Sequence, residues 1–486
     1  MSLFIKKPLE QLLAQSADSG KGLKRTLGPG NLIALGIGAI IGAGLFVRTA
    51  AAASQAAGPG VVVSYIIGGV GCAFAGLCYA EFASMIPIAG SAYAYAYVTM
   101  GEFIAWVIGW ALILEYALAG ATVAIAWSEY LNSLLGGAIP YEWCHSPWEA
   151  SAAGVSGIIN LPAIGILILV TLILIKGTQE SAAVNAIIVF IKVSIVLVVI
   201  AVGWGFINEA NYTPFIIPEG TVGHEGWNQH GWGGVIGGAG IVFFAFIGFD
   251  AVSTAAQEAK NPKRDMPIGI LGSLVVCTIL FVLFSHVLTG VANWQEFKVA
   301  GKEASVAYAI KTYMHGYEWL ATAVTVAILA GFTSVILVML MGQSRVFFSM
   351  SKDGLVPRVF SEIHPKFRTP FKSNAILFFC VAPFAGFVPG DIVGDLTSFG
   401  TLFAFVLVCA GIWVMRVKNP EAVRPFKTPL VPLVPILGMI ICSMLILALD
   451  DNTKLMALGW MVVGLFIYFL YGKGHSLLRS GKTDAN

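Results

Sequence analysis

Apolar residues fill most of the chain in long runs, and short polar segments or clusters of Pro and Gly separate these runs. Runs of about 20 apolar residues are typical of helices that cross a membrane. We therefore predict twelve transmembrane helices, with ends that are approximate. The predicted spans cover residues 31–53, 60–84, 102–132, 159–176, 183–207, 232–257, 268–291, 317–348, 373–389, 393–416, 430–449 and 455–472.

The composition agrees with a lipid environment. Hydrophobic residues make up 57% of the 486 residues and charged residues only 11%, whereas a soluble chain carries about 25% charged residues. Soluble enzymes and nucleic-acid binders are therefore excluded, and we expect membrane lipids and no nucleic acid as partners. Of the seven cysteines, six lie in apolar runs, so neither a disulfide framework nor a CxxC metal pair is indicated. We expect a monomer without a cofactor or a metal.

The distribution of Lys and Arg predicts the orientation. If the N-terminus is cytoplasmic, 22 of these residues lie in inner segments and 4 in outer loops. Positive charge accumulates on the cytoplasmic side of membrane proteins, so both termini should be cytoplasmic, in the cell membrane. Residues 1–30 then form a cytoplasmic segment, residues 208–231 an extracellular loop and residues 473–486 a cytoplasmic tail.

Glycines interrupt the first predicted span, which reads GIGAIIGAGLFV from Gly36 to Val47. Glycine is poorly compatible with a helix interior. Close helix packing through Gly38 and Gly42 is one explanation. The other is a helix that unwinds at Gly42, Ala43 and Gly44, which a membrane tolerates only where the released backbone groups line a cavity or meet a ligand.

A second interruption lies five spans later, between Gly237 and Lys260, with a glycine break at Gly248 and an acid at Asp250. Interrupted spans at positions one and six are typical of an inverted repeat of five plus five helices with the substrate between the breaks. We predict repeats at residues 31–207 and 232–416, followed by two further helices within 430–472. Unpaired N–H groups favour a carboxylate, and unpaired carbonyls favour an ammonium group. The pattern thus indicates a small zwitterion.

Four motifs resemble those of the amino acid/polyamine/organocation transporters. They are the Gly-rich first span, the stretch from Phe243 to Asp250, EAKNPKRDMP from Glu258 to Pro267 and SMSKDGLVP from Ser349 to Pro357. RPFKTPLVP, from Arg424 to Pro432, is most similar to bacterial members of the cationic amino acid transporter branch. The resemblance implies an all-α membrane protein with the LeuT-type fold in spans one to ten.

The resemblance also implies a binding site for the substrate backbone. The carbonyl of Ile40 would receive the ammonium, and the N–H groups of Gly42, Ala43 and Gly44 would hold the carboxylate. In span six, carbonyls at three positions would complete the ammonium site: Phe244, Ala245 and Ile247. Relatives place an aromatic residue at the Phe244 position to close over the substrate, although ordinary packing is the alternative. Many have Ser or Thr where Ala43 stands, so this chain would rely on main-chain groups.

Lys192 lies near mid-depth in span five, where a cation is costly unless it is paired, hydrated or neutral. In proton-coupled relatives a lysine at the matching place replaces a sodium ion and contacts carbonyls of the unwound first helix. We therefore predict that Lys192 couples transport to protons; a permanently charged structural contact is the alternative. Thr333 and Ser334 resemble the paired hydroxyls of sodium-driven members, but sodium and Lys192 would repel each other.

Other residues are candidates for the side-chain pocket or for gating. Glu115, in an apolar run of span three, could pair with a cationic substrate, relay a proton or accept hydrogen bonds while protonated. Asp250 is expected at a gate or on a proton route. Met341 could shape the pocket or simply fill space.

We therefore predict a secondary active transporter that imports small neutral or cationic L-amino acids, such as alanine or arginine, with protons and by alternating access. Sodium-coupled symport and exchange of amino acids or polyamines are alternatives within this class, and a transporter-like membrane sensor is an alternative outside it. The mid-depth charges do not form the ring that a channel requires. No GxSxG, HExxH or P-loop motif is present, so an enzyme is not expected.

Overall fold

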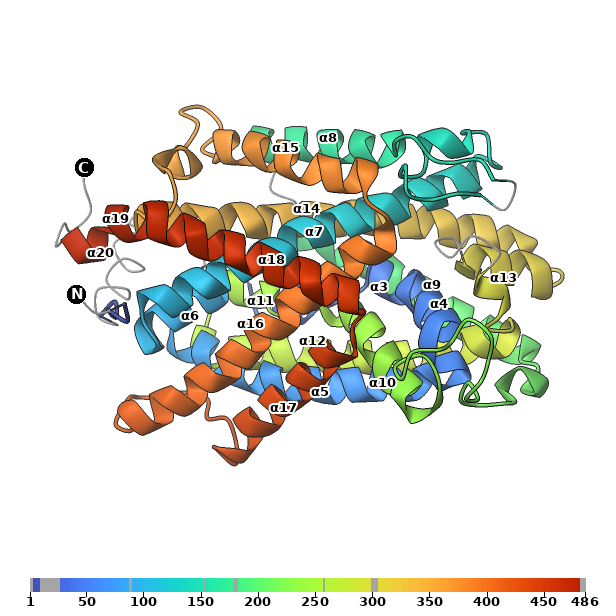
Figure 1. Ribbon diagram of the computed structural model, residues 1–486, viewed down its shortest axis with the longest axis horizontal. Helices are drawn as coiled ribbons and strands as arrows, with labels where there is room; N and C mark the ends of the chain where they lie inside the picture. Colours follow the sequence, from blue (N-terminus) through green and yellow to red (C-terminus); the bar gives the residue numbers. More distant parts are fainter. Residues whose placement is uncertain are drawn as a thin grey trace.

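The computed structural model is helical, with isolated β-bridges as its only extended pairing among the residues described here, which are 3–8, 27–86, 90–151, 154–177, 182–256, 258–298 and 305–480. Most of the predicted N-terminal segment 1–30 and part of the tail 473–486 lie outside them. The helices run roughly along one direction as a bundle, with both termini at the same end (Figure 1).

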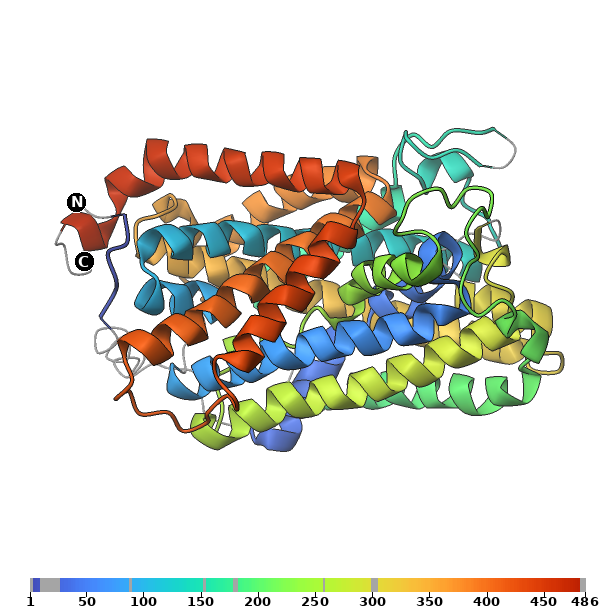
Figure 2. The same cartoon turned by 60° about the horizontal axis from the view of Figure 1, so that its bottom comes forward.

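Six helices of more than 20 residues form most of the bundle. They are α5 (Val61–Met85), α7 (Glu102–Leu134), α9 (Ala182–Gly203), α12 (Pro262–Val291), α14 (Glu318–Lys352) and α16 (Gly390–Lys418). Helix α7 packs against both α14 and α16, and α12 packs along α5, as Figure 2 shows. Because α7 is buried around most of its circumference, it forms the centre of the bundle.

Shorter apolar helices complete the bundle: α8 (Leu161–Lys176), α15 (Phe371–Phe387), α17 (Leu433–Ala448) and α18 (Asp451–Ile467). Helix α8 packs on α15 at one side of the molecule, and α17 packs on α16 and α5 (Figure 1). Helix α18 is followed by η10 (Tyr468–Gly472), α19 (Lys473–His475) and α20 (Leu477–Ser480) at the end that carries the termini. Helix α6 (Ser91–Thr99) covers that end, and α13 (Ser305–Tyr313) covers the other.

Two stretches are broken rather than continuous. The first consists of α2 (Pro29–Ile40), α3 (Ala43–Phe46), α4 (Arg48–Ala52) and the π-helix η1 (Ala53–Ala57). The second consists of α10 (Gly231–Val242), the 3₁₀-helix η6 (Phe243–Phe246) and α11 (Ala251–Thr254). These are the two interruptions that the glycine pattern predicted, and their short inner helices α3 and α11 are buried inside the bundle.

Eight helical stretches of the described chain are long and apolar enough to cross a membrane. Four apolar helices of 10–17 residues, α2, α8, α15 and α17, lie where further spans are predicted. A helix rises about 1.5 Å per residue, so helices this short need adjoining turns to cover a bilayer core of roughly 30 Å. A multi-pass membrane protein is thus supported, whereas the count of twelve and the inverted repeat stay predictions.

Candidate functional site

The first break releases backbone N–H groups inside the protein. Helix α2 ends at Ile40, Ile41 is extended, and Gly42 has φ −152° and ψ −147° before α3 begins at Ala43. Within the described chain, the N–H groups of Gly42, Ala43 and Gly44 find no acceptor. Buried N–H groups are almost always paired in folded proteins, so three consecutive unpaired donors indicate a place for an acceptor from outside the chain.

The second break releases carbonyl groups. Gly248 has φ +111°, and a Cβ there would lie 3.0 Å from backbone atoms of Ala39, so glycine suits both the conformation and the close approach. The carbonyls of Ala245 and Ile247 accept no hydrogen bond from the described residues, and the carbonyl of Phe244 accepts only the N–H of Ile247, at 3.3 Å. Phe244 itself is buried.

The two breaks touch each other. A Cβ on Gly44 would lie 2.2 Å from the Cα of Ala245, whereas a Cβ on Gly42 would lie 3.2 Å from the side chain of Val335 in α14. The carbonyl of Ile40 also accepts no hydrogen bond within the part of the chain described. The seven residues predicted to hold the substrate backbone therefore lie on two segments in direct contact. This arrangement leaves no room for a ligand between Gly44 and Ala245 until the segments separate.

Lys192 of α9 reaches the first break. Its side chain is 2% exposed, and Nζ donates to the carbonyls of Gly38 at 2.9 Å and Ile41 at 3.1 Å. Gly331 of α14 makes this possible, because a Cβ there would lie 2.7 Å from Cε of Lys192. This is the contact that a coupling role requires, but the geometry is equally compatible with a permanent structural contact.

The two hydroxyls compared with a sodium site differ in their surroundings. Thr333 donates to the carbonyl of Leu329 at 2.9 Å, as hydroxyls often do within a helix. Ser334 is buried, and its Oγ has no hydrogen-bond partner among the described residues. Ser334 thus keeps both its donor and its acceptors for another ligand, whereas Thr333 keeps only the lone pairs of its oxygen.

Two carboxylates lie in the interior near the second break. Glu115 of α7 and Asp250 are buried and interact electrostatically. The hydroxyl of Tyr116 donates to Oδ2 of Asp250. Oδ1 of Asp250 and both oxygens of Glu115 lack a hydrogen-bond partner in the described structure, as does the hydroxyl of Tyr79. Unsatisfied buried polar groups are rare and costly, so this cluster is a candidate for binding a proton or a cation.

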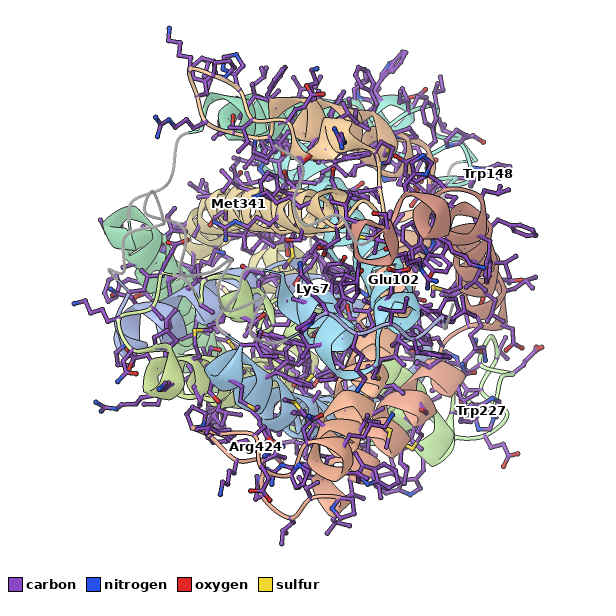
Figure 3. All side chains as sticks on the ribbon, turned by 90° about the vertical axis from the view of Figure 1, so that its left-hand side faces the viewer. Lys7, Glu102, Trp148, Trp227, Met341 and Arg424 are labelled. Atoms are coloured by element: carbon purple, nitrogen blue, oxygen red, sulfur yellow. The ribbon has the colours of Figure 1, made fainter. Side chains whose placement is uncertain are left out.

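Sequence reasoning missed the hydroxyl groups that hold α3, the helix that follows the first break. Tyr65 donates to the carbonyl of Gly44 at 3.2 Å, and Tyr130 donates to that of Phe46 at 3.3 Å. A buried Tyr at helix spacing gives no sign of its distant acceptor, so the sequence carries no usable signal. Met341 is half-buried on α14 (Figure 3) and is not among the side chains that pack against the core, so its place in the pocket stays a prediction.

Ion pairs close one end of the molecule over the breaks. Arg48, at the start of α4, is buried and pairs with Asp395 and, at 3.4 Å, with Asp391 of α16. These contacts join the first broken span to a neighbouring long helix. They are therefore suited to act as a gate at the end opposite the termini.

The other end is held by residues from both chain termini. Lys7 pairs with Asp353 at 2.8 Å. Glu102, which is fully buried, accepts hydrogen bonds from Tyr468 at 2.9 Å and from Arg479 at 2.5 Å. Figure 3, which views this end, shows Lys7 and Glu102 near its middle. Among the described residues, no group of three or more His, Cys, Asp or Glu side chains is placed to hold a metal ion.

Comparison of the sequence with known proteins identifies the family to which the chain is similar. Residues 27–470 match the amino acid permease family. The chain is 43% identical over 483 residues to the branched-chain amino acid permease BcaP of Bacillus subtilis (strain 168), and 42% identical over 481 residues to the methylthioribose transporter of the same organism; each alignment covers 98% of this chain and 99% of the relative. It is 33% identical over 424 residues to the vacuolar cationic amino acid transporter 4 of Arabidopsis thaliana, covering 87% of this chain and 68% of the relative.

Proposed function

The chain belongs to the amino acid permease family, and from this premise we propose that it imports L-amino acids across the cell membrane by proton-coupled alternating access. The proposed substrates are small neutral or cationic amino acids, with alanine and arginine as test cases. The proposed orientation has both termini in the cytoplasm, so the end with Lys7 and Glu102 is the inner end. Arg48 and its two aspartates then lie at the outer end.

The observation that carries the proposal is the pairing of opposite backbone groups at the two breaks. Among the described residues, the N–H groups of Gly42, Ala43 and Gly44 have no acceptor. Gly44 touches Ala245 of span six, where the carbonyls of Ala245 and Ile247 accept no hydrogen bond from the described chain. A carboxylate accepts from several N–H groups at once, and an ammonium donates to several carbonyls. An amino acid backbone satisfies both sets, so binding requires no particular side chain from the protein.

Lys192 is proposed as the coupling residue. While charged, it satisfies the carbonyls of Gly38 and Ile41 and fixes the first break. When it gives up its proton, the charge that holds these carbonyls is lost and the segment gains freedom to move. Because Lys192 contacts the segment that would bind the carboxylate, protonation and substrate binding are coupled through one short stretch of backbone.

Glu115 and Asp250 are proposed to decide between neutral and cationic substrates. If both carboxyl groups are protonated, they form a neutral polar surface that suits alanine. If one is ionised, it suits the guanidinium of arginine, which donates in a bidentate manner. Tyr116 holds one oxygen of Asp250 in either case. Phe244 closes over the bound substrate, and Met341 lines the side-chain end of the pocket.

Uptake of radiolabelled alanine and arginine into proteoliposomes tests the proposal, with and without an inward proton gradient and without sodium. We expect accumulation that requires the proton gradient. Accumulation that requires sodium would instead favour the sodium-coupled alternative. The hydroxyl of Ser334, which has no partner among the described residues, supports that alternative. Uptake that occurs only with amino acid or polyamine loaded inside would indicate exchange, and binding without uptake would indicate a sensor.

The same assay needs methylthioribose as a third label, because a protein of that name is 42% identical to this chain. Methylthioribose has hydroxyl groups in place of a carboxylate and an ammonium, so it would form weaker hydrogen bonds with the backbone N–H groups and carbonyls of the two breaks. Accumulation of methylthioribose without either amino acid would contradict the proposed substrate class, while leaving the transport mechanism standing.

A further inference from the structure

A cavity with a cationic lining lies at the end that carries the termini, where α16 turns into α17. Its volume is about 580 Å³, and its lining includes Arg416, Arg424, Lys427 and Val423. We call it the cationic cavity. Arg424 lies toward the margin of this end, whereas Lys7 and Glu102 lie near its middle (Figure 3). The cavity is thus separate from the two breaks and from the contacts of Lys7 and Glu102.

A buried carboxylate fixes the wall of the cationic cavity. Glu81 of α5 accepts from Nε and Nη2 of Arg416 at 2.9 and 2.8 Å and from Nε of Arg424 at 3.1 Å. The other two guanidinium nitrogens of Arg424 donate to backbone carbonyls of the same turn: Nη2 to that of Asn419 at 2.6 Å and Nη1 to that of Ala422 at 2.7 Å. Because Arg424 is held at every nitrogen, the loop forms a preformed wall rather than a loose connection.

Positive charge remains after these contacts. The turn carries four cations, Arg416, Lys418, Arg424 and Lys427, against the acids Glu81 and Glu421, which leaves +2. Nη1 of Arg416 has no acceptor, and neither lysine forms an ion pair, within the described chain. Outside the spans, burial and the charge of Lys418 lower the pKa of the amino group of Lys6. Because the two acids offset only half of these cations, the remaining positive charge indicates a site for an anion.

The surroundings of the cationic cavity favour a lipid as the source of that anion. Val423 in its lining is 84% exposed, and Leu430 in the same turn is 72% exposed. Val417, in the last turn of α16, is also exposed. Apolar residues around a polar cavity at a helix end are suited to the boundary between lipid tails and headgroups, where basic pockets bind anionic lipids. A small soluble anion would gain nothing from these apolar residues.

We propose that the cationic cavity binds the headgroup of an anionic phospholipid. Its phosphate accepts hydrogen bonds from Arg416 and Lys427, and its tails lie along Val423 and Leu430. The bound lipid therefore joins the end of α16 to the start of α17 and, through Glu81, to α5. This inference does not depend on the substrate or on the coupling ion, because none of these residues touches the two breaks.

Native mass spectrometry of the purified full-length protein, titrated with phosphatidylglycerol or phosphatidylcholine, tests the site. The variant Lys418→Gln/Lys427→Gln removes two cations that hold no ion pair in the described structure, so it should fold normally. The matched control is Lys176→Gln/Lys366→Gln, which removes two exposed lysines, one at the end of α8 and one shortly before α15. Each lysine near an anionic lipid contributes about fivefold in affinity, so the first variant should bind the tightest phosphatidylglycerol roughly 30-fold more weakly.

We expect the control variant to bind phosphatidylglycerol as tightly as the unaltered protein does. Phosphatidylcholine should bind equally to the unaltered protein and to both double variants. Equal weakening in both double variants would indicate a diffuse surface charge and overturn the site. No preference for phosphatidylglycerol in the unaltered protein would also overturn it. Displacement of bound lipid by millimolar inorganic phosphate at constant ionic strength would show that the cavity takes a free anion rather than a lipid.

Discussion

Replacing Lys192 tests whether the mid-depth cation couples transport or only holds the first break. Lys192→Ala removes two hydrogen bonds, to the carbonyls of Gly38 and Ile41, and leaves both acceptors buried. An unpaired buried group costs about 1–3 kcal/mol, so the closed arrangement should lose about 2–6 kcal/mol. We expect proteoliposomes with this variant to equilibrate substrate without concentrating it.

Lys192→Arg separates the two explanations. Arginine keeps the charge and the donors but does not lose its proton within a transport cycle. A structural contact predicts that this variant still accumulates substrate, whereas coupling predicts that it binds substrate and fails to concentrate it. Because the space beside Gly331 is tight, the melting temperature must be measured alongside uptake to show that the variant folds. Lys176→Ala, at the exposed end of α8, is the matched control.

One outcome would refute the coupling role of Lys192. If Lys192→Ala still concentrates substrate against its gradient in a pH-dependent manner, Lys192 does not carry the coupling proton. Coupling would then have to reside in the buried carboxylates Glu115 and Asp250.

Three further predictions concern other buried polar contacts. Tyr116→Phe removes the donor to Asp250, so a buried carboxylate oxygen loses a bond worth about 1–3 kcal/mol. Initial uptake rates should therefore fall about 5- to 150-fold. Arg479→Ala leaves the buried carboxylate of Glu102 without its cation and should destabilise the protein by about 3–5 kcal/mol, which a thermal melt detects. Burial disfavours protonated His145, but the hydrogen bond and charge of Glu129 outweigh burial and raise the pKa of His145 above 6.5. A group whose pKa is higher in the folded than in the unfolded protein stabilises the folded protein most when the pH lies below the unfolded-state pKa. This stabilisation is lost as the pH rises through the folded-state pKa. The melting-temperature difference between the unaltered protein and His145→Gln should therefore be larger at about pH 5.5 than at about pH 8.5.

Two of these predictions have a control variant. Tyr471→Phe changes another hydroxyl on a half-buried ring outside the carboxylate cluster and should leave uptake unchanged. Lys473→Ala removes an exposed cation near Arg479 and should leave the melt unchanged. Unaltered uptake in Tyr116→Phe, an unshifted melt in Arg479→Ala, or a His145→Gln difference that grows with pH would each contradict the corresponding assignment.

The sequence predicted much of the fold because membrane helices are encoded locally. Apolar runs, the glycines at Gly42 and Gly248, and the acid at Asp250 each mark a position without reference to distant residues. The contact partners are not encoded in this way. Nothing near Tyr65 or Tyr130 indicates that its hydroxyl meets a carbonyl of the first break, and Glu81 joins two arginines more than 330 residues away. Such contacts follow from how the helices pack, which a single sequence does not specify.

The contact between Gly44 and Ala245 changes what a substitution at the first break can reveal. Gly44→Ala keeps the N–H group that would hold the carboxylate, so main-chain binding alone predicts little effect. Its Cβ, however, would lie 2.2 Å from the Cα of Ala245, so the variant cannot adopt this closed arrangement and should lose transport. Gly42→Ala also keeps its N–H and meets only the side chain of Val335, at 3.2 Å; it should retain substrate binding. Transport that survives Gly44→Ala would mean that the two breaks need not touch during the cycle, and loss in both variants would point to backbone flexibility rather than to closure.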